Sequence, residues 1–90
     1  MELFKQSAST VEKLSEEELV VLHTQTGHYY TLNQTGCDIW KYCSEARSAE
    51  EIIAFIASEY ALSAEQAQKD IAPYLQFLCR ENLLEKQTSG

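Results

Sequence analysis

The chain has 90 residues, 44% of them hydrophobic, and carries 14 acidic against 7 basic side chains. This length indicates one domain with a modest core. A net charge of −7 excludes the phosphate backbone of a nucleic acid and an anionic membrane as natural partners. No apolar run reaches the roughly 20 residues that span a bilayer, and the N-terminus lacks the apolar segment of a signal peptide. We therefore expect a soluble, cytoplasmic protein.

The first third of the chain predicts an antiparallel β-meander. Apolar residues there alternate with polar ones or cluster in short runs, and turn-forming residues separate these runs. This pattern is typical of strands joined by tight turns. Residues 15–18 read as a polar turn, and Gly27 closes a hairpin because glycine adopts a positive φ at little cost. The expected strands are residues 8–14, which is the weakest, 19–22 and 28–32.

After Leu32 the pattern changes to that of helices. Thr35 to Asp38 has the form of a helix start, which predicts a short helix over 35–43. Ser48 with Glu51, and Ser63 with Gln66, have the spacing of capping boxes and predict the starts of two more helices.

The third helix is expected to be the longest. Asn82 stands where a helix commonly ends in the left-handed conformation, and Pro73 should kink the helix. A helical wheel predicts that a core stripe lies on one face, with Tyr74 at its edge. Asp70, Phe77 and Glu81 are expected beside Tyr74 on one flank. The stripe consists of Ala64, Ala67, Ile71, Leu75 and Leu78.

These elements predict an α+β fold, with a three-stranded antiparallel meander followed by three helices, in the order βββααα. This arrangement is winged-helix-like, with the wing placed first. We expect residues 1–90 to form a single domain that is ordered over about 8–85. Residues 1–6 and 86–90 are expected to be frayed ends.

The residues do not indicate an enzyme, a cofactor or a metal site. His23 and His28 flank the hairpin, but no further ligands follow at the spacing of a zinc site, and we expect exposed histidines. The three cysteines lack the pattern of a redox motif or a nucleophile, and we expect small buried side chains. A DNA-binding winged helix needs basic residues on its recognition helix, and none lies between Ser48 and Ser63.

Tyr29 and Tyr30 leave two interpretations open. They can simply pack on opposite faces of the sheet. Alternatively, the third strand has an open edge to which a partner adds a strand, through main-chain bonds and side-chain pockets. Phe77 lies about 100° from the core stripe, so nothing within the chain obviously requires an aromatic residue there.

A resemblance to a known family favours the second interpretation. The order of the hairpin, the turn at Asn33, the capped helix and the long last helix resembles the PqqD family, also called the RiPP recognition element, over about Val11 to Leu84. The chain departs from the family in the turn at residues 44–47, at Asn82 and at Pro73. The stretches that carry the resemblance are LVVLHTQTGHYYTLNQTGCDIWKYC, SAEEIIAFIASEY and KDIAPYLQFLCRENLL.

The resemblance implies a non-catalytic peptide chaperone. Such a domain binds the leader region of a ribosomally made precursor peptide as an added strand and presents the peptide to a modifying enzyme, such as a radical-SAM protein, a leader peptidase or a cyclase. Tyr30 and Leu32 are expected to point toward the helices, and Tyr29 and Thr31 away. Asp70 could pair with a basic leader residue. The implied peptide-binding residues are Tyr29, Tyr30, Thr31, Leu32, Asp70, Tyr74, Phe77 and Leu78.

Two alternatives remain open from the sequence. The chain could be a structural subunit of an unrelated complex, with the tyrosine strand paired to its own copy in a homodimer. It could also be an acidic winged-helix transcription factor, although its charge opposes DNA.

Overall fold

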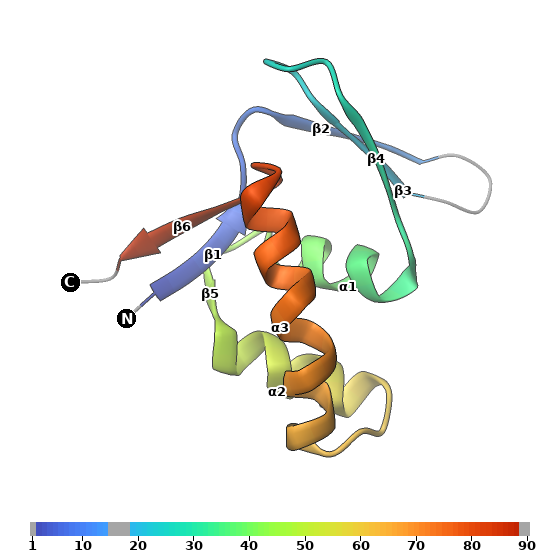
Figure 1. Cartoon of the computed structure of the whole chain (residues 1–90), viewed down its shortest axis with the longest axis vertical. Coiled ribbons are helices and arrows are strands. Elements are labelled where there is room, and N and C mark those ends of the chain that lie inside the picture. Colours follow the sequence, from blue (N-terminus) through green and yellow to red (C-terminus); the bar gives the residue numbers. More distant parts are fainter. Residues whose placement is uncertain (1, 15–18, 89–90) are drawn as a thin grey trace.

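The structure, a computed structural model, describes residues 2–14 and 19–88 and contains two three-stranded sheets and three helices (Figure 1). The strand orders are β5-β1-β6 and β2-β3-β4. No helix in these described ranges is long and apolar enough to cross a membrane. The elements are β1 (Glu2–Gln6), β2 (Thr10–Leu14), β3 (Leu19–His23), β4 (Tyr29–Leu32), α1 (Gln34–Tyr42), β5 (Arg47–Ser48), α2 (Ala49–Glu59), α3 (Ala64–Arg80) and β6 (Leu84–Thr88).

The predicted meander is confirmed. Strands β2, β3 and β4 pair antiparallel in chain order, with Val21 opposite both Glu12 and Tyr30. Gly27 has a φ of 76°, as the predicted hairpin turn requires. The polar turn expected at residues 15–18 lies outside the described residues. The meander projects from the rest of the molecule as a wing (Figure 1).

The three helices are confirmed, with one changed start. Asn33, not Thr35, caps α1, because its side-chain oxygen accepts the backbone N–H of Gly36 at 2.8 Å. Ser48 and Glu51 form the complete capping box expected for α2. Ser63 caps α3, but the side chain of Gln66 donates to Asp70 rather than reaching back to the cap.

Helix α3 carries the predicted core stripe, except at its first residue. Ala64 is exposed because it begins the first turn, where α3 has not yet met its neighbours. The helix continues through Pro73 to Arg80, and Asn82 has the predicted left-handed conformation, with a φ of 62°. The buried members of the stripe are Ala67, Ile71, Leu75 and Leu78.

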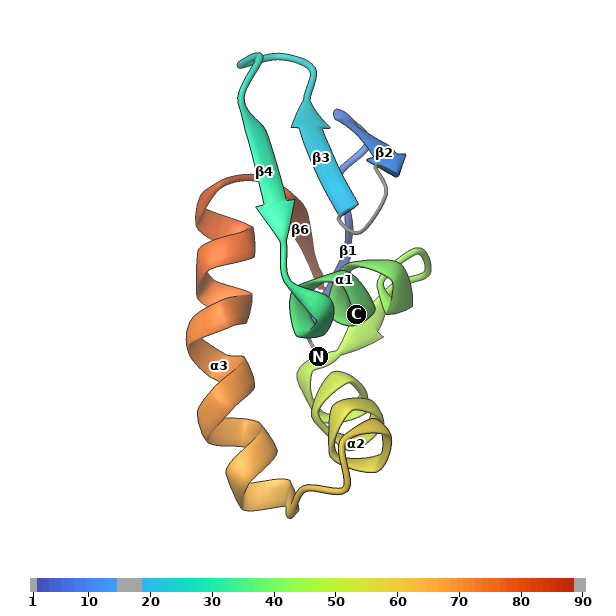
Figure 2. The same cartoon turned by 90° about the vertical axis from the view of Figure 1, so that its right-hand side faces the viewer.

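The prediction of frayed ends is wrong for residues 2–6 and 86–88, and residues 1, 89 and 90 lie outside the described residues. Strand β1 pairs antiparallel with β6 over their full lengths, from Glu2 opposite Thr88 to Gln6 opposite Leu84. The opposite edge of β1 pairs with β5. The side chains of Phe4 and Leu84 are buried in the core, which explains why the terminal segments are held in place. Strands β1 and β6 therefore lie side by side (Figure 2).

One hydrophobic core joins the two sheets and the three helices. Its members come from every layer: Phe4, Leu19, Val21, Leu32, Ile39, Trp40, Cys43, Ile52, Ile56, Ile71, Leu75, Leu78, Leu83 and Leu84. The buried Leu32 ends β4 immediately before α1 begins, and this ties the wing to the helices. The C-terminal part of α3 approaches β4 at Tyr30, whose ring meets that of Phe77.

Candidate functional site

Strand β4 has an unpaired edge. Among the described residues it pairs only with β3. The backbone N–H of His23 donates to the carbonyl of His28 at 3.0 Å, so this pair belongs to the hydrogen-bonded set of the ladder. Hydrogen-bonded pairs alternate along an antiparallel ladder, so Tyr30 and Leu32 also bond to β3. The backbone groups of Tyr29 and Thr31 therefore point to the free edge.

The side chains of β4 alternate as predicted. Leu32 is 3% exposed, and Tyr30 is half-buried on the same face, toward the helices. Tyr29 is 70% exposed and Thr31 is exposed, both on the opposite face. At the free edge the strand thus offers the backbone groups of Tyr29 and Thr31. The side chains that face the helices are those of Tyr30 and Leu32.

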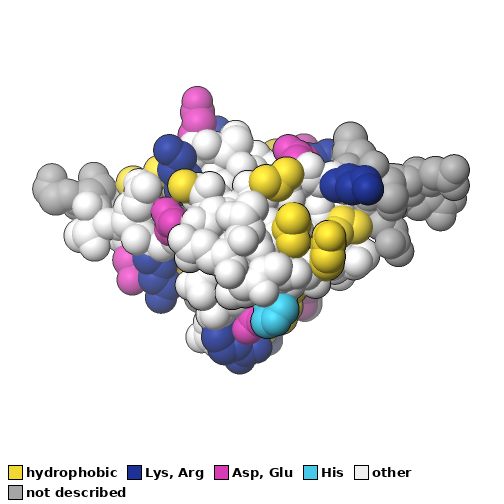
Figure 3. Space-filling view, turned by 90° about the horizontal axis from the view of Figure 1, so that it is seen from above, with side chains coloured by type: hydrophobic (Ala, Val, Ile, Leu, Met, Phe, Trp, Pro, Cys, Tyr) yellow, Lys and Arg dark blue, Asp and Glu magenta, His cyan; other side chains and the backbone are white. Residues whose placement is uncertain are grey.

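The outer face of the meander is apolar around Tyr29. Tyr29 lies opposite Leu22, which lies opposite Val11, and the side chain of Val11 is also exposed. Figure 3, which looks onto the wing from above, shows hydrophobic side chains gathered there. The side chain of Tyr29 is therefore exposed on the face of the meander that points away from the helices.

Tyr30 begins an aromatic row that leads from β4 to α3. The rings of Tyr30 and Phe77 meet edge to face, with centroids 6.4 Å apart, and those of Phe77 and Tyr74 do so at 6.2 Å. Such contacts are favourable because the positive edge of one ring meets the negative face of the next. The helical wheel suggested that Phe77 makes no contact within the chain. This interpretation is wrong, because its ring meets those of Tyr30 and Tyr74. We call Tyr30, Phe77 and Tyr74 the aromatic wall.

Tyr74 anchors the aromatic wall to the start of α1. A Cβ atom at Gly36 would lie 2.5 Å from the Cζ of Tyr74 and would overlap its hydroxyl oxygen. Only glycine therefore allows this approach of α3 to α1. Burial raises the pKa of Tyr74, and the backbone of Asn33 partly offsets the rise by hydrogen bonding.

The sequence analysis missed Glu81 as a site residue, although it had placed Glu81 on the same flank as Phe77. The hydroxyl of Tyr30 donates to Glu81 Oε1 at 3.1 Å, which ties β4 to the end of α3. Burial raises the pKa of Tyr30, and the adjacent carboxylate adds to the rise. The i, i+4 spacing from Phe77 to Glu81 was the available signal.

The remaining two predicted site residues lie apart from the exposed surface of the aromatic wall. Leu78 is 0% exposed, so it supports the wall from the core and offers no surface to a ligand. Asp70 is exposed one turn before Tyr74, where it accepts a hydrogen bond from Gln66 Nε2 at 3.0 Å. Its carboxylate remains accessible to a basic group.

Within residues 2–14 and 19–88, no group of three or more His, Cys, Asp or Glu side chains is placed to hold a metal ion. The expectation that both histidines are exposed is wrong for His23, which is 4% exposed. Its Nδ1 accepts the backbone N–H of Thr26 at 3.4 Å, so His23 supports the hairpin turn.

The prediction that the cysteines are buried is confirmed only for one of the three. Cys43 is buried, while Cys37 and Cys79 are half-buried. Burial raises the pKa of all three thiols, that of Cys43 to about 12. A thiolate is the reactive form, so these groups are poor nucleophiles near neutral pH.

Alkylation rates test this account of the thiols. At pH 8, a thiol with a pKa of about 12 is ionised to roughly one part in 10⁴, and burial blocks the reagent as well. We expect iodoacetamide to label Cys43 at least about 100-fold more slowly in the native protein than in urea, as followed by mass spectrometry. Rapid native labelling of Cys43 would contradict its placement in the core.

Comparison with known proteins supplies the context for this geometry. The sequence profile described as Coenzyme PQQ synthesis protein D (PqqD) matches residues 18–84. A structure of TbiB1 in complex with the TbiA(beta) leader peptide is 32% identical, with a TM-score of 0.80, over 96% of this chain and 99% of that chain. A lasso peptide synthetase B1 complexed with the leader peptide has the same fold, with a TM-score of 0.77 and 23% sequence identity. The match covers 91% of this chain and 96% of that chain. A search of curated proteins gave no match.

Proposed function

Because this chain belongs to the PqqD family, we propose that it binds the leader region of a ribosomally synthesised precursor peptide and presents it to a modifying enzyme. The observation that carries the proposal is the free edge of β4 beside the aromatic wall. A leader peptide is the ligand in the structure of TbiB1, which is 32% identical to this chain.

The leader adds as a strand to β4. Its backbone bonds to the free N–H and C=O groups of Tyr29 and Thr31. Alternate leader side chains then face the same side as Tyr30 and contact the exposed parts of Tyr30, Phe77 and Tyr74. The backbone bonds provide affinity for any extended chain, and the aromatic wall selects apolar side chains.

The acidic charge of this chain also favours basic residues in the leader. The chain has a net charge of −7, and Asp70 and Glu81 lie at either end of the α3 part of the aromatic wall. We propose that Asp70 pairs with a basic leader residue. Such an exposed pair steers association and register more than it adds affinity.

The domain itself performs no chemistry in this proposal. It acts in the cytoplasm as a single domain, and it raises the concentration of the precursor at an enzyme such as a radical-SAM protein, a leader peptidase or a cyclase.

Isothermal titration with a synthetic leader, from the precursor encoded beside this gene, tests the proposal. We expect Phe77→Ala to weaken binding by roughly tenfold or more, because it removes the centre of the aromatic wall. The same change should lower the free energy of unfolding by about 1–3 kcal/mol, since the ring of Phe77 also packs against Tyr30 and Tyr74.

Tyr29→Ala is the matched control, because it removes an exposed aromatic side chain from the opposite face of the same strand and keeps the backbone groups. Binding should change less than about threefold. If the leader does not bind the unchanged protein and the protein forms dimers in solution, the homodimer interpretation replaces this proposal.

A further inference from the structure

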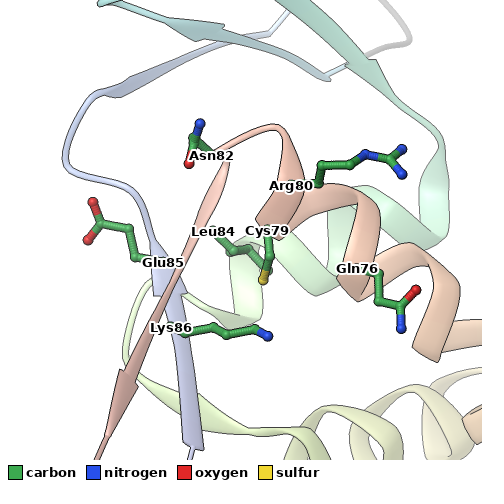
Figure 4. Close-up of a pocket in the computed structure, with 7 residues that line it drawn as sticks. All are labelled: Gln76, Cys79, Arg80, Asn82, Leu84, Glu85 and Lys86. Atoms are coloured by element: carbon green, nitrogen blue, oxygen red, sulfur yellow. The ribbon is translucent and has the colours of Figure 1, made fainter.

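A second groove lies between α3 and β6 (Figure 4). Its volume is about 680 Å³. It shares no residue with the aromatic wall, and most of β6 lies beyond the residues that match the family profile. The groove is lined by Gln76, Cys79 and Arg80 from α3, Asn82 from the turn, and Leu84, Glu85 and Lys86 from β6.

This groove follows the free edge of β6. Successive side chains of a strand point to opposite faces, so a hollow lined by both Glu85 and Lys86 must run along the edge of the strand. The other edge of β6 is occupied by β1, the only strand with which β6 pairs in the described part of the chain.

The backbone of β6 has unpaired groups along this edge. The N–H of Ser7 donates to the carbonyl of Leu83 at 3.0 Å, and this pair continues the register of β1 with β6. Because hydrogen-bonded pairs alternate along an antiparallel ladder, the backbone groups of Glu85 and Gln87 bond to β1. The backbone groups at alternate positions, Leu84, Lys86 and Thr88, face the groove side without a strand partner.

Two of the side chains that line the groove are cationic. Arg80 and Lys86 are 74% and 54% exposed, on a chain whose net charge is −7. Arg80 Nε lies 3.5 Å from Glu81, and the Arg80 guanidinium lies over the ring of Phe77, 5.8 Å from its centroid. Lys86 Nζ lies 4.0 Å from Glu2, and such exposed pairs hold weakly. The acidic member of the lining, Glu85, accepts a hydrogen bond from Ser7 Oγ at 3.3 Å and points away from α3 (Figure 4).

We propose that the β6 groove is a second strand-binding surface, which takes an extended, acidic segment of a partner protein. Main-chain bonds join that segment to the backbone of Leu84, Lys86 and Thr88. Its carboxylates pair with Arg80 and Lys86. The two surfaces follow the free edges of different strands, β4 and β6.

Backbone NMR of the ¹⁵N-labelled full chain at low salt tests this proposal. The probe is a capped ten-residue peptide in which glutamate alternates with valine and threonine, and the comparison peptide carries lysine at each glutamate position. We expect the acidic probe to shift the amide resonances of residues 84–88 and Arg80, and the basic peptide to leave them in place. Raising the salt concentration should weaken binding, because exposed charges are screened.

Charge variants separate the site from a general charge effect. The double variant Arg80→Gln with Lys86→Gln should weaken binding of the acidic probe by roughly three- to tenfold. The matched control, Lys41→Gln with Lys69→Gln, removes the same charge from exposed positions elsewhere and should leave binding unchanged. The proposal is overturned by equal shifts with both peptides, by shifts centred on residues 29–32, or by no shift at β6 up to millimolar probe.

Discussion

Replacing Thr31 with proline is expected to reduce leader affinity by roughly tenfold to a hundredfold while the domain stays folded. The N–H of Thr31 faces the free edge of β4, so proline removes a donor to the leader without removing a bond to β3. The leader carbonyl that loses this donor is left unpaired at a cost of about 1–3 kcal/mol, which covers the expected range of affinity loss. Titration calorimetry measures the affinity, and thermal unfolding checks the fold.

The neighbouring residue provides the control for this prediction. The N–H of Tyr30 faces β3, so Tyr30→Pro should break the meander and lower the melting temperature sharply. Thr31→Val keeps the backbone donor and should bind the leader within about threefold of the unchanged protein. If Thr31→Pro binds the leader as tightly as Thr31→Val does, the leader does not pair with β4.

Replacing Gly36 with alanine is expected to destabilise the domain by about 1–3 kcal/mol, because the added Cβ overlaps the ring and hydroxyl of Tyr74. Helix propensity alone predicts the opposite sign, since alanine within a helix is favoured over glycine by about 1 kcal/mol. Urea unfolding followed by circular dichroism measures the change. Leader binding should also weaken, because a displaced Tyr74 distorts the aromatic wall.

A double-mutant cycle identifies the cause. In a Tyr74→Ala background the obstructing ring is absent, so Gly36→Ala should become neutral or stabilising. Equal effects of Gly36→Ala in both backgrounds would show that the Tyr74 contact does not require glycine at this position.

The elements that depend on local signals could be predicted from the sequence. The meander, the left-handed Asn82 and the Ser48 capping box all follow from residues within a few positions of one another. The pairing of β1 with β6 could not be predicted in this way, because it joins segments about 80 residues apart. The exposed side chains of β6 after Leu84 also give no periodic signal.

The candidate site was predictable to a similar degree. Alternation in β4 predicted the directions of Tyr30 and Leu32, and the helical wheel placed Phe77 beside Tyr74. The contact between Tyr30 and Phe77 depends on how β4 packs against α3, which a single-helix pattern does not contain. The same packing explains why Glu81 joins the site and why Leu78 is enclosed.

Amide hydrogen exchange with and without the leader tests strand addition to β4 most directly. We predict that the leader slows exchange at Tyr29 and Thr31, whose N–H groups are free, and changes Tyr30 and Leu32 little, because β3 already protects them. Unchanged exchange at Tyr29 and Thr31 in the presence of bound leader, or protection at residues 84–88 instead, would contradict the account.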